Sequence, residues 1–388
     1  MSSSRPHILF LPRWYPNRYD PMPGLFIRYQ AEALAASCDI TVLYIHSDPN
    51  CPNRYETEFS AENGVNVIRV YYQPASDPIG RWRRFYTAHI AGLAMLGNYM
   101  PDLIHVHVLT RQGVMGALLA GRMKVPYVIS EHWSRYFPEN DFFRNPVRKW
   151  LTRLVVGRAA AIITVSGKLR EAMKAKGLHH PSYHVVPNVL DMDRFRIVPT
   201  GQAGERKTAL HVSCFDDRSK NISGLLEAVR QVCETTPGFV LRLVGDGPDF
   251  DKMKAYARRL GLGPETVVFP GLKEGEELVA EYGNASFSVL SSRFETFGTV
   301  VPESLACGTP VLATAVGIAP ELVNARNGIL VEPGNTDALA GGLIRMLDLC
   351  ESFDREEVRG SVGDRFTPAS VSAELMKIYT ASMAGKYV

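Results

Sequence analysis

Two glutamates in the last third of the chain are the residues whose spacing most strongly suggests chemistry. Glu295 and Glu303 have seven residues between them, in the segment RFETFGTVVPESLACGTP that runs from residue 293 to residue 310. Two carboxylates at this spacing can divide their work, one facing a reacting sugar and the other reaching a ribose hydroxyl pair. The alternative is an ordinary helix start, where the helix dipole favours negative charge.

The residues around the two glutamates predict how they are held. Residues 286–290 (SFSVL) are apolar and predict a buried strand, and residues 299–307 predict a helix whose first turn tolerates Pro302. A strand therefore leads through a glycine-bearing turn into a helix. The N–H groups of Gly298 and Thr299 lie at this helix start, where unpaired donors predict a site for a phosphate or diphosphate.

The same segment carries a family signature. It resembles the E-x7-E motif of retaining glycosyltransferases of family 4, also called glycosyltransferase group 1, which have the two-lobed GT-B fold. The matching residues are Glu295, Phe297, Gly298, Glu303, Gly308 and Pro310. The resemblance implies an α/β protein in which two Rossmann-like lobes face each other across an interdomain cleft.

The resemblance implies roles for residues of both lobes. The catalytic residues would be Glu295, His132 and Lys220, with the imidazole facing the donor sugar or phosphate and the ammonium meeting the diphosphate as a point charge. The donor-binding residues would be Gly24, Arg218, Gly245, Gly247, Gly298, Thr299 and Glu303. Two of these roles have structural alternatives, since Gly24 can serve a turn alone and Lys220 can be a solvated residue at a helix start.

One expected phosphate ligand is missing. In the register that places Lys220 on the family's lysine, Phe215 stands where an arginine usually does. A phenyl ring cannot bind two phosphate oxygens as a guanidinium does. Arg218 or an inward-pointing Arg293 would be the substitute, and without one the phosphate clamp is weakened.

Another predicted strand carries two histidines, His105 and His107, two residues apart near its end. Side chains two residues apart on a strand lie on the same face. They either line the cleft or form hydrogen bonds within the sheet.

Two runs of alternating apolar strands and helices predict parallel sheets covered on both faces. The first run places strands at 7–11, 40–45, 65–71, 103–108, 127–130, 161–165 and 184–186, and the second at 209–212, 240–244, 267–270, 287–290, 310–313 and 328–331. Residues 196–206, rich in Pro, Gly and charge, predict the linker. We expect an acceptor-side domain of residues 1–196 with a returning helix at 368–388, and a nucleotide-sugar domain of residues 207–367.

Composition narrows the classes of function. With 388 residues and 46% hydrophobic content there is enough material for two cores, and a net charge of only +3 does not indicate nucleic-acid binding. The apolar run at the start of the chain is too short for a signal peptide or a membrane span. The six cysteines show no C-x-x-C spacing, which predicts free thiols and no zinc site. We therefore expect a cytoplasmic protein.

The sequence gives few indications of the acceptor substrate. Basic and aromatic residues gather at 81–85 (RWRRF) and at 135–153. Such faces can lie on an anionic membrane surface or be solvated helix faces with buried stems. If these faces lie on a membrane, we expect the acceptor to be a lipid-linked saccharide of a cell-envelope polysaccharide pathway, and the protein to be peripheral to the inner face of the cell membrane.

For mechanism, the resemblance implies transfer from a UDP- or GDP-linked sugar to a saccharide or lipid-linked hydroxyl with retention at the anomeric carbon. The leaving diphosphate would accept the acceptor's proton, and we expect no metal or other cofactor. Two rival classes are a two-lobed solute-binding protein, which would need a secretory signal, and a catalytically silent nucleotide-sugar-binding scaffold.

Overall fold

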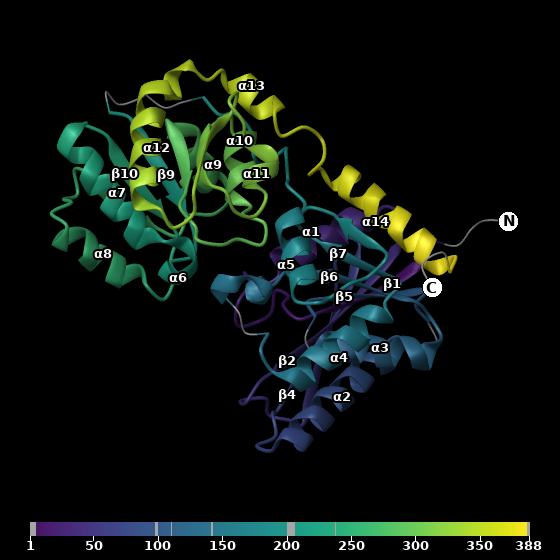
Figure 1. Cartoon of the computed structure of the whole chain (residues 1–388). Coiled ribbons are helices and arrows are strands. Elements are labelled where there is room, and N and C mark those ends of the chain that lie inside the picture. Colours follow the sequence, from purple (N-terminus) through teal and green to yellow (C-terminus); the bar gives the residue numbers. More distant parts are fainter. Residues whose placement is uncertain are drawn as a thin grey trace. The chain divides into compact units, whose positions relative to one another are not determined.

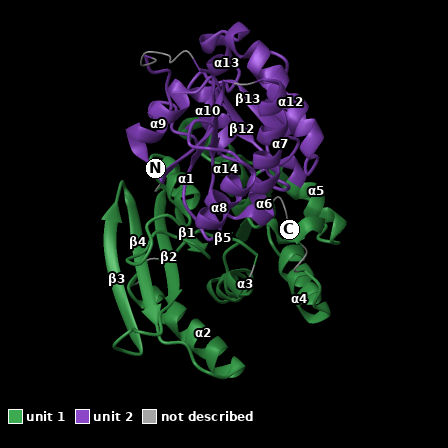
Figure 2. Cartoon of the chain, turned by 90° about the vertical axis from the view of Figure 1, so that its left-hand side faces the viewer, with its two compact units in different colours: residues 1–165, 169–189, 368–388 green, residues 166–168, 190–367 purple. Residues whose placement is uncertain are grey.

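The computed structural model describes residues 5–97, 100–109, 111–140, 143–199, 206–236 and 238–385. It divides into two compact units, each built on its own sheet with helices on both faces (Figures 1 and 2). Unit 1, green in Figure 2, comprises residues 1–165, 169–189 and 368–388, and unit 2, purple, comprises 166–168 and 190–367. The fold predicted from the sequence, two Rossmann-like α/β lobes, is confirmed.

Unit 1 has an eight-stranded sheet in the order β3-β4-β2-β1-β5-β6-β7-β8. The strands are β1 (His7–Pro12), β2 (Asp39–Ser47), β3 (Tyr55–Glu62), β4 (Val65–Tyr72), β5 (Leu103–His107), β6 (Tyr127–Glu131), β7 (Ala161–Thr164) and β8 (Tyr183–Val185). The helices are α1 (Leu25–Leu34), α2 (Pro78–Ala94), α3 (Arg111–Met123), η1 (Ser134–Tyr136), η2 (Pro138–Asn140), α4 (Pro146–Gly157), α5 (Gly167–Ala175) and α14 (Pro368–Met383). Every pairing is parallel except β3 with β4.

Unit 2 has a six-stranded, all-parallel sheet in the order β11-β10-β9-β12-β13-β14. The strands are β9 (Thr208–Val212), β10 (Val240–Val244), β11 (Val267–Gly271), β12 (Phe287–Leu290), β13 (Val311–Thr314) and β14 (Gly328–Val331). The helices are α6 (Asp217–Lys220), α7 (Ile222–Thr235), α8 (Phe250–Arg259), α9 (Gly275–Asn284), α10 (Val300–Ala306), α11 (Ala319–Leu322), α12 (Thr336–Leu349), η3 (Cys350–Ser352) and α13 (Arg355–Gly360).

Local signals in the sequence fix several helix starts. Asp77 and Asn145 precede a proline and accept hydrogen bonds from the N–H groups of Gly80 and Arg148, which caps α2 and α4. Proline at the first helical position loses no hydrogen bond, and a short polar side chain before it satisfies a free N–H. Asn335 caps α12 in the same way.

Two details differ from the sequence expectation. The strand β3 was not predicted, because its alternating YETEFSAE pattern is polar and half exposed, as suits an antiparallel edge strand. The segment 190–196 belongs to unit 2 rather than to the first domain. The Arg359 guanidinium holds it there by donating to the carbonyl oxygens of Met192, at 2.8 Å, and Phe195, at 2.6 Å. Residues 200–205 of the predicted linker lie outside the described residues.

The chain order reverses at one point in each sheet. The first strand of unit 1, β1, lies between β2 and β5, and the first strand of unit 2, β9, lies between β10 and β12. In open parallel sheets, ligands bind beyond the carboxyl ends of the strands at such a switch point. The loops after β1 and β5, and those after β9 and β12, are therefore the places to look for a site.

Candidate active site

At the switch point of unit 2, Lys220 and Glu295 form a close ion pair. Lys220 is the last residue of α6, the short helix that follows β9, and Glu295 lies in the loop after β12. The Lys220 Nζ lies 2.5 Å from the Glu295 Oε1. Their side chains are only 19% and 12% exposed. Burial lowers the pKa of the Lys220 ammonium, but the neighbouring Glu295 carboxylate, together with Cys214 and Asp216, holds that pKa above its usual value. The structure thus holds Lys220 as an ammonium paired with the Glu295 carboxylate, and its contact with a diphosphate stays a prediction.

The start of α10 faces the same loop. Gly298 has a φ of 84°, and the exposed Thr299 precedes the first helical residue. Among the described residues, the N–H groups of Gly298 and Thr299 have no hydrogen-bond partner. These two donors are available to an anion, and their role in binding a phosphate stays a prediction.

Glu303 has different surroundings from Glu295. It lies on α10, partly buried, and its Oε2 accepts a hydrogen bond of 3.0 Å from the hydroxyl of the fully buried Tyr282. Burial raises the pKa of the Glu303 carboxyl to about 7, although the Tyr282 hydrogen bond and the charge of Arg194 oppose this. At neutral pH this carboxyl is therefore poised between its charged and neutral forms.

The missing arginine at position 215 has a structural explanation. Phe215 is completely buried and packs edge-on against Phe250, with ring centroids 4.8 Å apart. A side chain at this position points into the core of unit 2, where a guanidinium would be costly. Neither proposed substitute is a simple replacement: Arg293 donates to the carbonyl oxygen of Asp217 at 2.7 Å, and Arg218 is exposed on α6.

The two glycines after β10 shape the neighbouring loop. A Cβ on Gly245 would come within 1.9 Å of the Ser213 carbonyl oxygen, and one on Gly247 within 2.6 Å of the Phe215 nitrogen. The loops after β9 and β10 also pair, since the Phe215 N–H donates to the Asp246 carbonyl oxygen at 3.0 Å. Gly245 and Gly247 are thus required by packing within unit 2, whether or not they also contact a donor.

Gly24 has a similar requirement in unit 1. It stands just before α1 with a φ of 77°, and a Cβ there would lie 2.2 Å from the Trp14 carbonyl oxygen. Close approach of two backbones needs a residue without a side chain. The turn alternative from the sequence is thus sufficient to explain this glycine, and a contact with donor phosphates remains a prediction.

His132 lies in a stack of buried rings in unit 1. It is 8% exposed, 4.6 Å from Phe26 between ring centroids, and its Nε2 is 3.4 Å from the Nδ1 of His107. Burial lowers the pKa of His132 to about 3, so the imidazole is neutral at physiological pH. It can therefore act through a hydrogen bond but not as a cation.

His105 and His107 are fully buried as well, and His105 bonds to Tyr379 and Ser130 at 2.6 and 2.7 Å. For His105, hydrogen bonding within the fold is the observed role.

Family models match both halves of the chain. Residues 194–356 match the model described as glycosyl transferases group 1, and residues 23–189 match a glycosyl transferase 4-like domain. The 2-deoxystreptamine glucosyltransferase of Streptomyces kanamyceticus is 30% identical over 65% of this chain and 69% of its own length. The chain belongs to the group 1 glycosyltransferases.

Two further similarities extend this result. A putative teichuronic acid biosynthesis glycosyltransferase, TuaC of Bacillus subtilis, is 26% identical over 87% of this glycosyltransferase and 88% of its own length. Anabaena HepE, solved in complex with UDP and glucose, has a TM-score of 0.76 with 19% identity, over 97% of this chain and 99% of that one. The family predicted from the sequence is confirmed, and the solute-binding alternative is wrong.

The glycosyltransferase also has site residues that its sequence did not reveal. The hydroxyl of Ser292 donates to the Glu295 Oε1 at 2.9 Å, and that of Ser291 donates to the Lys220 carbonyl oxygen at 2.8 Å; both serines are fully buried. The only signal was a pair of small polar residues directly after a buried strand. Many strand ends share that pattern, so it did not single them out.

The predicted residues fall on both units. Unit 2 holds Lys220, Arg218, Gly245, Gly247, Glu295, Gly298, Thr299 and Glu303, while unit 1 holds Gly24 and His132. Within unit 2 the structure brings Lys220 and Glu295 into contact. None of the helices in the described part of this glycosyltransferase has the length and apolar character needed to cross a bilayer.

Proposed function

We propose that this glycosyltransferase moves a sugar from a UDP- or GDP-linked donor to a hydroxyl of a saccharide or lipid-linked acceptor, with retention at the anomeric carbon and without a metal. The observation that carries the proposal is the largely buried Lys220–Glu295 pair, together with the N–H groups of Gly298 and Thr299, which have no hydrogen-bond partner among the described residues. Family membership supports the reaction class, and the complex of HepE with UDP and glucose supports a nucleotide-sugar donor. Similarity to the teichuronic acid enzyme supports an acceptor in the cell envelope.

The chemistry follows from these charges. The bond between the sugar's anomeric carbon and the donor phosphate oxygen breaks, and a bond to the acceptor oxygen forms on the same face. The acceptor's proton passes to the departing phosphate oxygen. Negative charge grows on the diphosphate, and Lys220 with the two N–H groups stabilises it in a fixed geometry. Removing one such stabilising donor typically costs a factor of about 100 to 1,000 in rate.

Ser292 and Glu295 hold the lysine in place. The Glu295 Oε1 accepts from both the Ser292 hydroxyl and Lys220, which limits the positions open to the ammonium. The protein then need not reorganise this charge as the diphosphate leaves. A catalytically silent nucleotide-sugar-binding scaffold is the second candidate, favoured by the phenylalanine at position 215.

The first experiment is protection against thermal unfolding by UDP-, GDP- and ADP-sugars, because a ligand that binds only the folded state raises its stability. Wild type should respond to one nucleotide. The variant Lys220→Met should keep the fold and lose most of the response. The control variant Glu356→Gln changes an exposed residue and should respond as wild type does.

Transfer assays with the responding donor separate the two candidates. A transferase yields a product with the donor's anomeric configuration, visible by NMR, and keeps its rate in EDTA. Nucleotide binding without transfer or donor hydrolysis on a panel of saccharide and lipid-linked acceptors would favour the scaffold. An inverted product, or loss of rate in EDTA, would contradict the retaining or metal-independent part.

A further inference from the structure

Unit 1 contains a large pocket at its own switch point. Its volume is about 940 Å³, and it is formed by the loops after β1, β5 and β6, the end of β2, and the helices α2, α3 and α4. Both basic and aromatic segments noted in the sequence contribute to its wall, Trp82 and Phe85 from the first and Arg135 and Arg148 from the second. These residues are thus joined around one cavity of unit 1.

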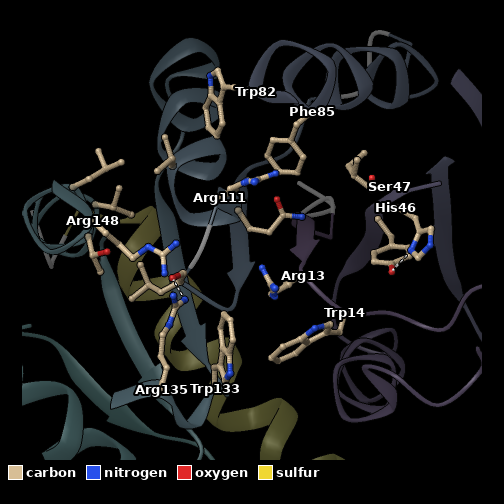
Figure 3. Close-up of a pocket in the computed structure, with 18 of the residues that line it drawn as sticks. Arg13, Trp14, His46, Ser47, Trp82, Phe85, Arg111, Trp133, Arg135 and Arg148 are labelled. Atoms are coloured by element: carbon tan, nitrogen blue, oxygen red, sulfur yellow. Dashed lines mark hydrogen bonds between the residues drawn. The ribbon is translucent and has the colours of Figure 1, made fainter. Parts of the chain in front are cut away.

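Four arginines line this pocket. They are Arg13, Arg111, Arg135 and Arg148, and the described residues that line the pocket include no aspartate or glutamate. None of the four forms an ion pair with a carboxylate among the described residues. Figure 3 shows Arg13, Arg111 and Arg148 between Trp82 and Phe85 on one side and Trp14 and Trp133 on the other. Four positive charges thus converge on one cavity without a counter-ion in its lining.

Trp133 organises two of these charges. The Arg13 guanidinium carbon lies 4.6 Å from the centre of the Trp133 ring, and that of Arg135 lies 4.2 Å from it. A cation against an aromatic face is held in place but is not neutralised. The Nε atoms of Arg13 and Arg135 are both buried and have no hydrogen-bond partner. Arg135 itself is only 3% exposed and donates to the Leu109 carbonyl oxygen.

The neighbouring positive charges also affect the pKa of Arg13. Its pKa is lowered first by burial and then by the charges of Arg135 and Arg111. The carboxylate of Glu131, which is completely buried, opposes this shift and raises the pKa of Arg13. Its oxygens already accept hydrogen bonds from the N–H groups of Leu109, His132 and Trp133 and from the hydroxyl of Tyr136, at 2.9 to 3.0 Å. Glu131 is therefore held by its own hydrogen bonds, and among the described residues it forms no ion pair with the arginines of the pocket.

We propose that this pocket binds an oxyanion, a carboxylate or a phosphate, attached to the acceptor sugar. Guanidinium groups bind both oxyanions through paired hydrogen bonds, and indole faces suit the apolar face of a sugar ring. Three of the four tryptophans of the chain, Trp14, Trp82 and Trp133, line the pocket. The inference rests on the proposed function for the word acceptor, while the anion site itself does not depend on it.

The test measures binding to the full chain by calorimetry and tryptophan fluorescence, without any donor. Three probes share a hexose ring: methyl β-D-glucuronide, α-D-glucose 1-phosphate and the neutral methyl β-D-glucoside. The variants are Arg111→Gln and Arg148→Gln, both exposed and thus safe for folding. The control is Arg122→Gln, which removes one exposed charge from α3 outside the pocket.

At least one anionic probe should bind about tenfold or more tightly than the neutral glucoside. Each pocket variant should weaken that binding about tenfold, because a hydrogen bond to a charged group contributes about 1.5 to 3 kcal/mol and about 1.4 kcal/mol is a factor of ten. Arg122→Gln should bind as wild type. Preference for the glucuronide identifies a uronate acceptor, and preference for the sugar phosphate identifies a phosphorylated one.

Equal binding of the neutral glucoside, or unchanged binding in both arginine variants, would overturn the proposal. UDP and GDP titrations of the same variants provide a further check. If nucleotide affinity falls together with the anion affinity, the arginines serve the donor diphosphate and the acceptor assignment is wrong. If the wild-type protein binds the anionic probe but binds neither UDP nor GDP, the result would count against the proposed function, while the anion site itself would stand.

Discussion

Replacing Glu303 by glutamine should change how the stability of the protein depends on pH. In the folded protein the pKa of this carboxyl is about 7, against a usual value of 4.5. Because the folded state binds the proton more tightly than the unfolded chain does, the carboxyl stabilises the fold fully below pH 4.5. That contribution is lost as the pH rises through 7.

The magnitude follows from the two pKa values. Their difference of about 2.5, at about 1.36 kcal/mol for each pKa step, corresponds to about 3 kcal/mol of unfolding free energy. The glutamine of Glu303→Gln cannot ionise, and its carbonyl oxygen can still accept the Tyr282 hydrogen bond. Relative to wild type, the variant should therefore gain stability steadily between pH 5 and pH 8, up to about 3 kcal/mol.

Urea unfolding from pH 5 to pH 8 provides the assay. The difference in unfolding free energy between the two proteins isolates Glu303, because the buried histidines titrate in both. Glu356→Gln, an exposed carboxylate on α13, is the matched control and should run parallel to wild type. If Glu303→Gln also runs parallel to wild type, the carboxyl is not held in a raised-pKa site and the reasoning fails.

Two other predictions concern the fold. Gly245→Ala should lower the free energy of unfolding, measured in urea, by roughly 2 to 4 kcal/mol, because its Cβ would lie 1.9 Å from the Ser213 carbonyl oxygen. The control Gly121→Ala, in open space on α3, should instead raise the free energy of unfolding by about 0.5 to 1 kcal/mol. Similar losses in both variants would contradict the steric argument. The pKa of the fully buried His89 is lowered by burial to about 4, so its stabilising contribution is lost as the pH falls below 6.5. Between pH 7.5 and pH 5, His89→Phe should therefore lose about 2 kcal/mol less unfolding free energy than wild type does, measured by the same unfolding assay. If the unfolding free energies of the two proteins change with pH in the same way, the imidazole protonates in the folded state and the reasoning fails.

Local patterns predicted most elements because each strand is a short apolar run bounded by turn residues. The helix predicted at residues 299–307 is observed as α10, Val300–Ala306. The edge strand β3 was missed, since half of its side chains face solvent and its alternation is polar. The burial of Phe215 was not predicted either, because the direction of a side chain after β9 depends on the core of unit 2 against which it packs.

The sequence by itself determined the family and the two-sheet architecture. Motif spacing reflects turns and helix starts, and these depend on residues close together in the chain. Tertiary structure alone decided which charges meet. Lys220 and Glu295 are 75 residues apart and form a pair because β9 and β12 are neighbours. Arg13, Arg111 and Arg135 converge on the pocket of unit 1 because they follow β1, β5 and β6, which end at the same edge of one sheet, and Arg148 reaches the same pocket from α4. No local pattern specifies this arrangement.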